Sequence, residues 1–361
     1  MFNRRIFLKN IVACSMVFLR RNVFCAETSL PFVSEETNIV DYTSNQTVHS
    51  EYKKWGFINK KGALVSLSGF DYAGSFSEGI AVIKIDDKYG YVDRRGNLII
   101  KPQFNCAREF SCGLAYVEKE GFCGFIDKSG NSIIKLPPLF EYPFAGFTEG
   151  VYPVEFKGKW GYIDTKGTWV ITPYFDRADN FYNNRACICL DGKYGYLNKA
   201  GTLIIEPKFD CAGAFRDEVA LVKMNNVEMF IDQNGETAFV NKHDILWPFS
   251  EGLAAVIIKN KCGFINTRGE VVITPQFDAC FSFSKGLAAV RKGNKWGYID
   301  TTGELVISLM FDIAWRFSEG LASVQLGDRL GYIDKKGSFV INPAFAVARP
   351  FSGDFAAVCF E

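Results

Sequence analysis

Bulky and polar residues alternate most clearly in KWGYIDTTGELVI, residues 295–307. Side chains along a strand point alternately to its two faces, so Trp296, Tyr298 and Asp300 fall on one face and the intervening residues on the other. These aromatic and β-branched residues are types that strands favour. The Asp-x-x-Gly that follows predicts a turn, and residues 305–307 predict the returning strand.

The same pattern recurs nine times along the chain. The residue before its Tyr or Phe falls at positions 56, 90, 124, 161, 195, 229, 263, 297 and 331, which are 34 apart except for one interval of 37. A second element, such as FSKGLAAV (283–290), accompanies each copy, and a third, such as VVITPQFDACFSF (271–283), lies between the two. A period this regular predicts a repeat architecture and overrides the two or three domains that 361 residues alone would suggest.

Each unit is predicted to hold three strands and a short fourth near Phe277-Asp278. Residues 287–290 should pair with the Trp strand through the turn at 292–294, because both runs are extended and apolar. The glycine after the Trp predicts a close approach of another backbone or ring. The expected turns include Asp93/Gly96, Asp164/Gly167, Asp300/Gly303 and Asp334/Gly337, and the expected core anchors are Phe70, Phe104, Phe140, Phe175, Phe209, Phe277, Phe311 and Phe345.

These residues resemble the bacterial WG-repeat family, which pairs Trp-Gly or Tyr-Gly with a Phe-Ser-Glu-Gly-Leu-Ala element. The resemblance covers residues 52–361 and implies an all-β repeat array of unsettled biochemical role, with no shared catalytic residue. One unit departs from the pattern. It has Glu228 at the Trp position, Met229 at the Gly position and His243 at a Phe position.

The two ends of the array are out of phase by half a unit. It begins at the Trp strand of Trp55 and ends at residues 355–358, which belong to the second element. The last strand could therefore pair with the first, which predicts a β-propeller-like ring with few exposed strand edges. Nine units exceed the usual four to eight blades, so an open, curved β-solenoid is the alternative.

The N-terminal residues predict export. Residues 1–26 are expected to form a signal peptide, because Arg4-Arg5-Ile6-Phe7-Leu8-Lys9 resembles a twin-arginine signal and a short apolar run follows. Residues 27–51 would be a linker and 52–361 the repeat domain. The expected location is the periplasm or cell envelope, with the cytoplasm as the alternative, and no membrane span remains after cleavage.

Charge and composition narrow the possible chemistry. The formal charge is +1, and removal of five basic residues with residues 1–26 leaves 36 basic against 40 acidic residues, a net −4. Neither value favours nucleic acid. With only two histidines and no recognised catalytic or phosphate-binding motif, we expect no enzyme, metal or cofactor. The nine cysteines after residue 26 are interpreted as small buried residues rather than a disulfide ladder.

Two groups of side chains could bind a partner. Trp55, Trp160 and Trp296 share one repeat position, and Trp247 and Trp315 share another; either group serves the core or stacks on sugars or partner proteins. The aspartates of the repeated Phe-Asp either form a carboxylate ring or cap strand ends, and these are Asp71, Asp176, Asp210, Asp278 and Asp312. The sequence favours an exported, monomeric, non-catalytic scaffold that binds a protein or polymer, with a cell-wall carbohydrate binder as the alternative.

Overall fold

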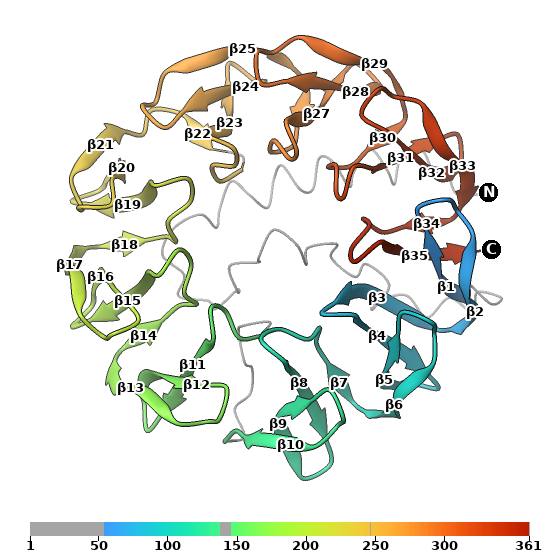
Figure 1. The fold of residues 1–361 in the computed structure, drawn as a ribbon. Helices are drawn as coiled ribbons and strands as arrows, with labels where there is room; N and C mark the ends of the chain where they lie inside the picture. Colours follow the sequence, from blue (N-terminus) through green and yellow to red (C-terminus); the bar gives the residue numbers. More distant parts are fainter. Residues whose placement is uncertain (1–53, 138–145, 246, 361) are drawn as a thin grey trace, which may run out of the picture.

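Nine small sheets arranged in a ring make up the molecule (Figure 1). The computed structural model describes residues 54–137, 146–245 and 247–360, and its regular elements there are all strands. The protein is thus a nine-bladed β-propeller, which confirms the all-β ring and not the open solenoid. The expected signal peptide, the linker and Phe140 lie outside the described residues.

The blades are numbered here from the first complete sheet, with strands in sheet order. Blade 1 is β3 (Tyr72–Ser77), β4 (Ile80–Ile85), β5 (Lys88–Asp93) and β6 (Leu98–Phe104), and blade 2 is β7 (Cys106–Ala107), β8 (Leu114–Lys119), β9 (Phe122–Asp127) and β10 (Ser132–Lys135). Blade 3 is β11 (Val151–Phe156), β12 (Lys159–Asp164) and β13 (Trp169–Phe175), and blade 4 is β14 (Arg177–Ala178), β15 (Ala186–Leu190), β16 (Lys193–Leu197) and β17 (Leu203–Phe209). Blade 5 is β18 (Cys211–Ala212), β19 (Ala220–Met224), β20 (Val227–Ile231) and β21 (Thr237–Val240), and blade 6 is β22 (Asp244–Ile245), β23 (Leu253–Ile258), β24 (Lys261–Asn266) and β25 (Val271–Phe277).

The remaining three blades bring the two ends of the array together. Blade 7 is β26 (Ala279–Cys280), β27 (Leu287–Lys292), β28 (Lys295–Asp300) and β29 (Leu305–Phe311), and blade 8 is β30 (Ile313–Ala314), β31 (Ala322–Leu326), β32 (Arg329–Ile333) and β33 (Phe339–Phe345). Blade 9 is β34 (Val347–Ala348), β35 (Phe355–Phe360), β1 (Lys54–Asn59) and β2 (Leu64–Phe70). The first strand has only two residues in blades 2 and 4–9. The first strand lies toward the centre of the ring and the fourth lies outside, as β3 and β6 of blade 1 show (Figure 1).

Blade 7 shows how closely the strands follow the sequence pattern. β27 and β28 pair antiparallel from Leu287↔Asp300 to Lys292↔Lys295, through the expected turn. The short strand expected near Phe277-Asp278 begins slightly later, at Ala279, because Phe277 still pairs at the end of β25. Blade 7 therefore has the expected strands in the expected order, and the other blades follow it, except that blade 3 has three strands in the described residues.

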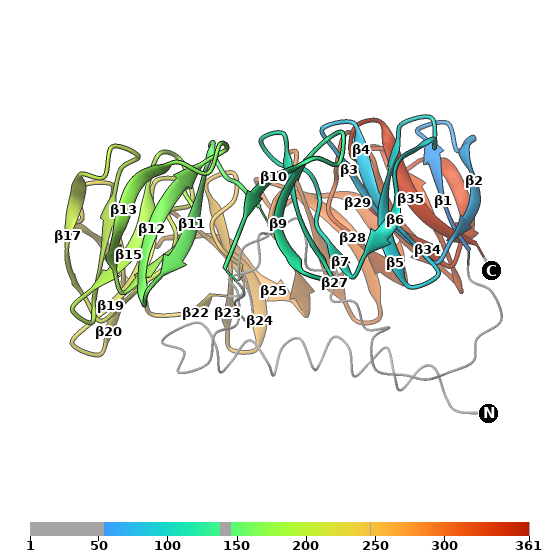
Figure 2. The ribbon, with the colours of Figure 1, turned by 90° about the horizontal axis from the view of Figure 1, so that it is seen from below.

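Consecutive strands run in opposite directions, so the ring has two distinct faces (Figure 2). The turns after the third strand and the tips of the hairpins between the first and second strands lie on one face, here called the Asx face. In blade 7 its Asx turn closes when Asp300 Oδ1 accepts from the backbone N–H of Thr302 at 2.9 Å and of Glu304 at 3.1 Å. Gly303 takes a φ of 91° in this turn, which confirms the expected role of that glycine.

The turns expected in blades 1, 3 and 8 share this geometry, with one difference from the sequence-based expectation. Gly96, Gly167 and Gly337 have φ angles of 80°, 81° and 83°, and their N–H groups donate to the carbonyl oxygens of Asp93, Asp164 and Asp334 at 2.9, 2.9 and 3.0 Å. The difference is that the first two aspartates still pair as the last residues of β5 and β12. The turn proper is therefore the two residues between aspartate and glycine, and the glycine closes it.

Two of these turn glycines also contact the preceding blade. A Cβ on Gly167 of blade 3 would lie 3.4 Å from Ile134 Cγ1 of blade 2, and one on Gly337 of blade 8 would lie 2.9 Å from Ile307 Cγ2 of blade 7. Glycine at this position therefore serves the packing of one blade on the next as well as the turn.

The glycine at the Trp-Gly position of the repeat is crowded by backbone in seven blades. In blade 8, Leu330 pairs with Phe345 and Tyr332 pairs with Ile341, so β33 bulges opposite Gly331. A Cβ on Gly331 would lie 2.6 Å from the carbonyl oxygen of Ile341. The same contact with a neighbouring backbone occurs at Gly90, Gly124, Gly161, Gly195, Gly263 and Gly297. The predicted close approach is thus confirmed.

The core lies between neighbouring blades rather than inside any one of them. Trp296, Tyr298 and Phe311 of blade 7 pack with Ala314 and Phe317 of blade 8 in one buried cluster. Every expected Phe anchor in the described residues is buried: Phe70, Phe104, Phe175, Phe209, Phe277, Phe311 and Phe345. Since a blade covers its apolar face only with its neighbour, the closed ring is required for full burial.

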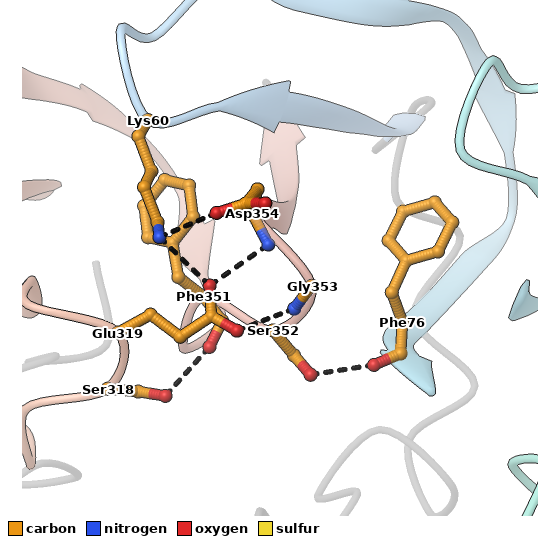
Figure 3. Close-up of polar contacts among 8 residues, drawn as sticks. All are labelled: Lys60, Phe76, Ser318, Glu319, Phe351, Ser352, Gly353 and Asp354. Atoms are coloured by element: carbon orange, nitrogen blue, oxygen red, sulfur yellow. Dashed lines mark hydrogen bonds and ion pairs between the residues drawn. The ribbon is translucent and has the colours of Figure 1, made fainter. Parts of the chain in front are cut away.

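Blade 9 closes the ring with strands from both ends of the array. β1 pairs with β35 along its whole length, from Lys54↔Phe360 to Asn59↔Phe355. On the Asx face, Lys60 Nζ lies 3.1 Å from Glu319 Oε2 of blade 8 and 2.8 Å from Asp354 Oδ1 (Figure 3). The two half-units therefore complete one blade, as the half-unit offset predicts.

Closure repeats a contact found elsewhere around the ring. Ser352 Oγ of blade 9 donates to the carbonyl oxygen of Phe76 in blade 1 at 2.6 Å (Figure 3). Ser318 Oγ of blade 8 makes the same bond to Phe351 of blade 9 at 2.7 Å. Blade 9 is therefore joined to its neighbours by the same hydrogen bond that joins blades whose strands are consecutive in sequence.

Candidate functional site

The three tryptophans of the Trp-Gly position lie between blades. Trp296 is only 5% exposed within the cluster that blades 7 and 8 share. Trp55 and Trp160 are half-buried against the corresponding clusters of their own blades. Packing accounts for most of the surface of these rings, so of the three only Trp55 and Trp160 retain area for a ligand.

A row of aromatic rings lies beside the short first strands of blades 6, 7 and 8, and we call this innermost part of the blades the inner wall. Two of the rings, Trp247 and Phe281, also pack against the buried clusters between blades. Trp247, Phe281 and Trp315 occupy equivalent positions 34 residues apart, each just after the short first strand of its blade or at its end. Their ring centroids are 5.6 Å apart from Trp247 to Phe281 and 5.7 Å from Phe281 to Trp315. The indole of Trp247 is fixed by a 2.9 Å hydrogen bond to the Cys280 carbonyl, while Trp315 is 38% exposed.

Arg349 of blade 9 occupies the equivalent position of the repeat, 34 residues after Trp315. Its guanidinium lies 5.1 Å from the ring centroid of Trp55 and 5.0 Å from that of Tyr72. Its Nε is buried and has no hydrogen-bond partner in the described residues. We call Trp247, Phe281, Trp315 and Arg349 the inner aromatic arc.

The rest of the inner wall differs from the arc in chemistry. The equivalent positions in blades 1, 2, 4 and 5 hold Gly74, Arg108, Asp179 and Gly213. Burial raises the pKa of the Asp179 carboxyl to about 6, opposed by the nearby Arg177. One side of the inner wall therefore carries three aromatic residues and an arginine at this position, and the other side carries charged residues or glycine.

Sequence reasoning found Trp247 and Trp315 but missed Phe281 and Arg349. The repeat register contains the signal that was missed, because all four residues are separated by multiples of 34. The repeat register alone does not show whether that position faces the core or the inner wall.

The aspartates of the repeated Phe-Asp cap turns on the face opposite the Asx face. In blade 8, Asp312 lies 2.8 Å from Lys295 Nζ of blade 7 and accepts from the backbone N–H of Gly327 at 2.8 Å. Asp176, Asp210 and Asp278 are paired with lysines in the same way, which lowers the pKa of each carboxyl. The capping interpretation is confirmed, and these carboxylates are engaged in joining blades.

A disulfide joins blades 6 and 7. Cys262 of β24 and Cys280 of β26 are bonded, with their Cα atoms 6.2 Å apart. Sequence reasoning missed this pair, although a signal exists. Cys262 and Cys280 are 18 residues apart. The equivalent two positions of other blades hold an aromatic residue and an alanine that pack on each other, as Trp296 and Ala314 do. Two cysteines replace both members of that pair at once.

The burial expected for the other cysteines holds for most of them. Cys187, Cys189, Cys211 and Cys359 are buried, and Cys106 and Cys123 are half-buried. Cys112 is exposed, because it lies in the hairpin tip of blade 2 on the Asx face. The interpretation as small buried residues is therefore wrong for Cys112. Cys262 and Cys280 are buried as expected, but they are bonded to each other.

Metal binding and membrane insertion can be assessed for the described part of the chain. There, no three His, Cys, Asp or Glu side chains come close enough to hold a metal ion. The same residues contain no helix with the length and apolar character needed to cross a membrane.

Comparisons with known proteins agree with this geometry. A family model described as "WG containing repeat" matches nine segments, residues 55–89, 89–121, 124–160, 160–194, 194–227, 229–262, 263–296, 296–329 and 331–361. No curated protein matches the sequence.

Solved structures resemble the chain in fold alone. A structure titled "Crystal structure of the eukaryotic initiation factor" is 11% identical over 86% of this chain and 98% of that one, with a TM-score of 0.54. Hsv2p of Kluyveromyces lactis (8% identity, 63% and 92% covered, TM-score 0.38) and apo AztD of Citrobacter koseri (12%, 84% and 85%, 0.33) are more distant.

Proposed function

The chain belongs to the WG-repeat family, and we propose that it is an exported, non-catalytic binding scaffold whose partner rests on the inner aromatic arc. The observation that carries this proposal is the asymmetry of the inner wall. Equivalent positions of the repeat hold Trp247, Phe281, Trp315 and Arg349 on one side, and no aromatic residue at the four positions named on the other.

Tryptophan and arginine at adjoining positions suit recognition of another molecule. Residues of these types dominate the binding energy of protein interfaces, because they bury large areas and combine apolar and polar contacts. Trp315 has 38% of its surface exposed, and Arg349 places a guanidinium beside the rings of Trp55 and Tyr72. The partner we propose is therefore a protein segment or polymer with apolar groups and an acceptor near Arg349.

A carbohydrate polymer is the second candidate. Phe281 and Trp315 stack with an interplanar angle of 27°, so two nearly parallel rings lie along the inner wall. Flat rings with apolar faces can pack on the apolar faces of sugar rings. Co-sedimentation with purified cell-wall polysaccharide distinguishes this candidate from a protein partner.

The decisive variants are Phe281→Ala and Trp315→Ala. Both should lose capture of the partner from an envelope extract and from polysaccharide. Trp315→Ala should retain the unfolding midpoint within a small shift, whereas Phe281→Ala should lower it, because Phe281 also packs on the buried Trp296. Trp169→Ala is the matched control, because Trp169 is 37% exposed on the outer strand β13. Equal capture by all three variants would refute the arc as the binding surface.

Export is proposed on the character of residues 1–26. N-terminal sequencing of the chain purified from the producing cell tests it. A mature chain that begins near residue 27 in the envelope fraction agrees with export, whereas an intact N-terminus in the cytoplasm contradicts it.

A further inference from the structure

Blade 5 departs from the repeat at its outer strand. In blade 6, the fourth strand bulges over Gly263 and continues to the buried Phe277. In blade 5, Met229 replaces that glycine and pairs directly with Val240, so the bulge is absent at this point. β21 ends at Val240, and His243 is half-buried where other blades have the Phe anchor.

This irregular end leaves a cavity of about 270 Å³ between blades 5 and 6. Phe239, Val240, Lys242 and His243 line it from blade 5, and the Asx turn of blade 6 contributes Arg268 together with the glycine that follows it. Phe239 stands where other blades have an isoleucine, and its ring stacks on that of Phe230 at 4.7 Å and 19°. Gly269 also lies close over this ring, because an added Cβ there would lie 2.5 Å from Phe239 Cδ2. One wall of the cavity is therefore a fixed aromatic ring that Phe230 and Gly269 leave partly uncovered.

Three nitrogen-bearing side chains line the same cavity. The side chains of Lys242, His243 and Arg268 make no hydrogen bond or ion pair with any described residue. The neighbouring carboxylates are held elsewhere, since Glu228 accepts from the Asn241 amide at 3.2 Å and Glu270 from the Asn266 amide at 2.7 Å. The cavity thus combines positive charge with unused donors and has no carboxylate among its lining residues.

We propose that this cavity binds a small organic anion, whose phosphate or carboxylate group meets Lys242, His243 and Arg268 and whose planar part packs on Phe239. A guanidinium donates two parallel hydrogen bonds to such an oxyanion, and an ammonium group adds a point charge. The volume lies just below the 300–1,000 Å³ typical of pockets for drug-sized ligands, which suits a ligand of few atoms. The site lies on the outer side of the ring, apart from the inner aromatic arc.

The test uses the full chain and calorimetric titration with phenyl phosphate, benzoate and inorganic phosphate. Phenyl phosphate should bind saturably and several-fold more tightly than inorganic phosphate, because only the former can contact Phe239. Binding of benzoate tests whether a carboxylate can replace the phosphate group of the ligand. The imidazole resonances of His243, assigned with His243→Gln, should shift during the same titration.

Arg268→Gln and Lys242→Gln should each weaken phenyl phosphate binding about tenfold or more, because charged hydrogen bonds are lost. Arg95→Gln is the matched control, since Arg95 occupies the same turn position in blade 1, away from the cavity. The proposal is overturned if none of the three anions binds at millimolar concentration. It is also overturned if Arg95→Gln weakens binding as much as Arg268→Gln, which would indicate only general attraction to a basic surface. Loss of this site would leave partner capture by the inner aromatic arc unchanged.

Discussion

Replacing Gly331 by alanine should destabilise the ring, although alanine is the better residue for an ordinary strand. The added Cβ would lie 2.6 Å from the Ile341 carbonyl oxygen, 2.7 Å from the Pro343 nitrogen and 2.9 Å from the Asn342 carbonyl carbon. All three atoms are backbone, so no side-chain rotation relieves the contact. Gly331 is not in the positive-φ region, so crowding alone opposes the substitution.

The expected loss is about 1–3 kcal/mol, the usual cost of forcing an extra carbon into a packed interior. A gain of about 0.5–1 kcal/mol from reduced backbone freedom offsets part of it. Equilibrium urea unfolding, followed by intrinsic fluorescence, measures the midpoint and its slope. A lower midpoint with an unchanged slope identifies a loss of stability rather than a change in the unfolded chain.

Gly69→Ala supplies the control for this experiment. Gly69 also lies in a strand, β2, but an added Cβ there meets nothing within 4 Å. Its midpoint should stay the same or rise slightly. If Gly331→Ala behaves like Gly69→Ala, the glycine is not required by the bulge, and the explanation given for the repeated Trp-Gly pair is wrong.

Three further predictions test the joints between blades and the inner wall. Removing the disulfide with Cys262→Ala and Cys280→Ala should cost about 3 kcal/mol for a link across 18 residues, and reduction of the unmodified chain should lower its unfolding midpoint equally. Ser352→Ala and Ser318→Ala should each cost about 1 kcal/mol in urea unfolding, because both remove the same hydrogen bond; a neutral Ser352→Ala would contradict ring closure. Asp179→Asn should raise stability at pH 7.5 by up to about 3 kcal/mol, and the gain should vanish near pH 4.

The sign of the last effect follows from the raised pKa. Between pH 3.8 and about 6 the folded chain keeps the proton on Asp179 that the unfolded chain releases, so stability falls as pH rises through this window. Asp176→Asn is the contrasting variant, because Lys159 lowers the pKa of Asp176. It should cost less than about 1 kcal/mol at pH 7.5, since the pair is exposed. A loss of stability in Asp179→Asn at pH 7.5 would refute the buried, ionised carboxyl.

Much of the fold could be predicted because each unit repeats the same local rules. The Asx turns, the crowded glycines and the buried Phe anchors depend on residues within one unit or its nearest neighbour. The half-unit offset between Trp55 and residues 355–358 also predicted closure. These features need only a period and the chemistry of each residue at its place in that period.

The candidate sites were harder to predict, because they depend on differences between units. Phe281 looks like any other aromatic residue of the repeat until its neighbours along the inner wall are known. The disulfide requires knowing that positions 18 residues apart face each other across two blades. The cavity beside His243 lies where Met229 removes a bulge, and the sequence shows only that this unit departs from the repeat.

The origin of blade 9 has a consequence for synthesis in the cell. β1 leaves the ribosome among the first strands, but its partner β35 is made only after eight other blades. During most of translation, β1 and β2 therefore have a bare apolar side and an unpaired edge. Protection of that early hairpin until residues 355–360 emerge becomes a requirement for productive synthesis, and shortening the domain at either end would damage one and the same blade.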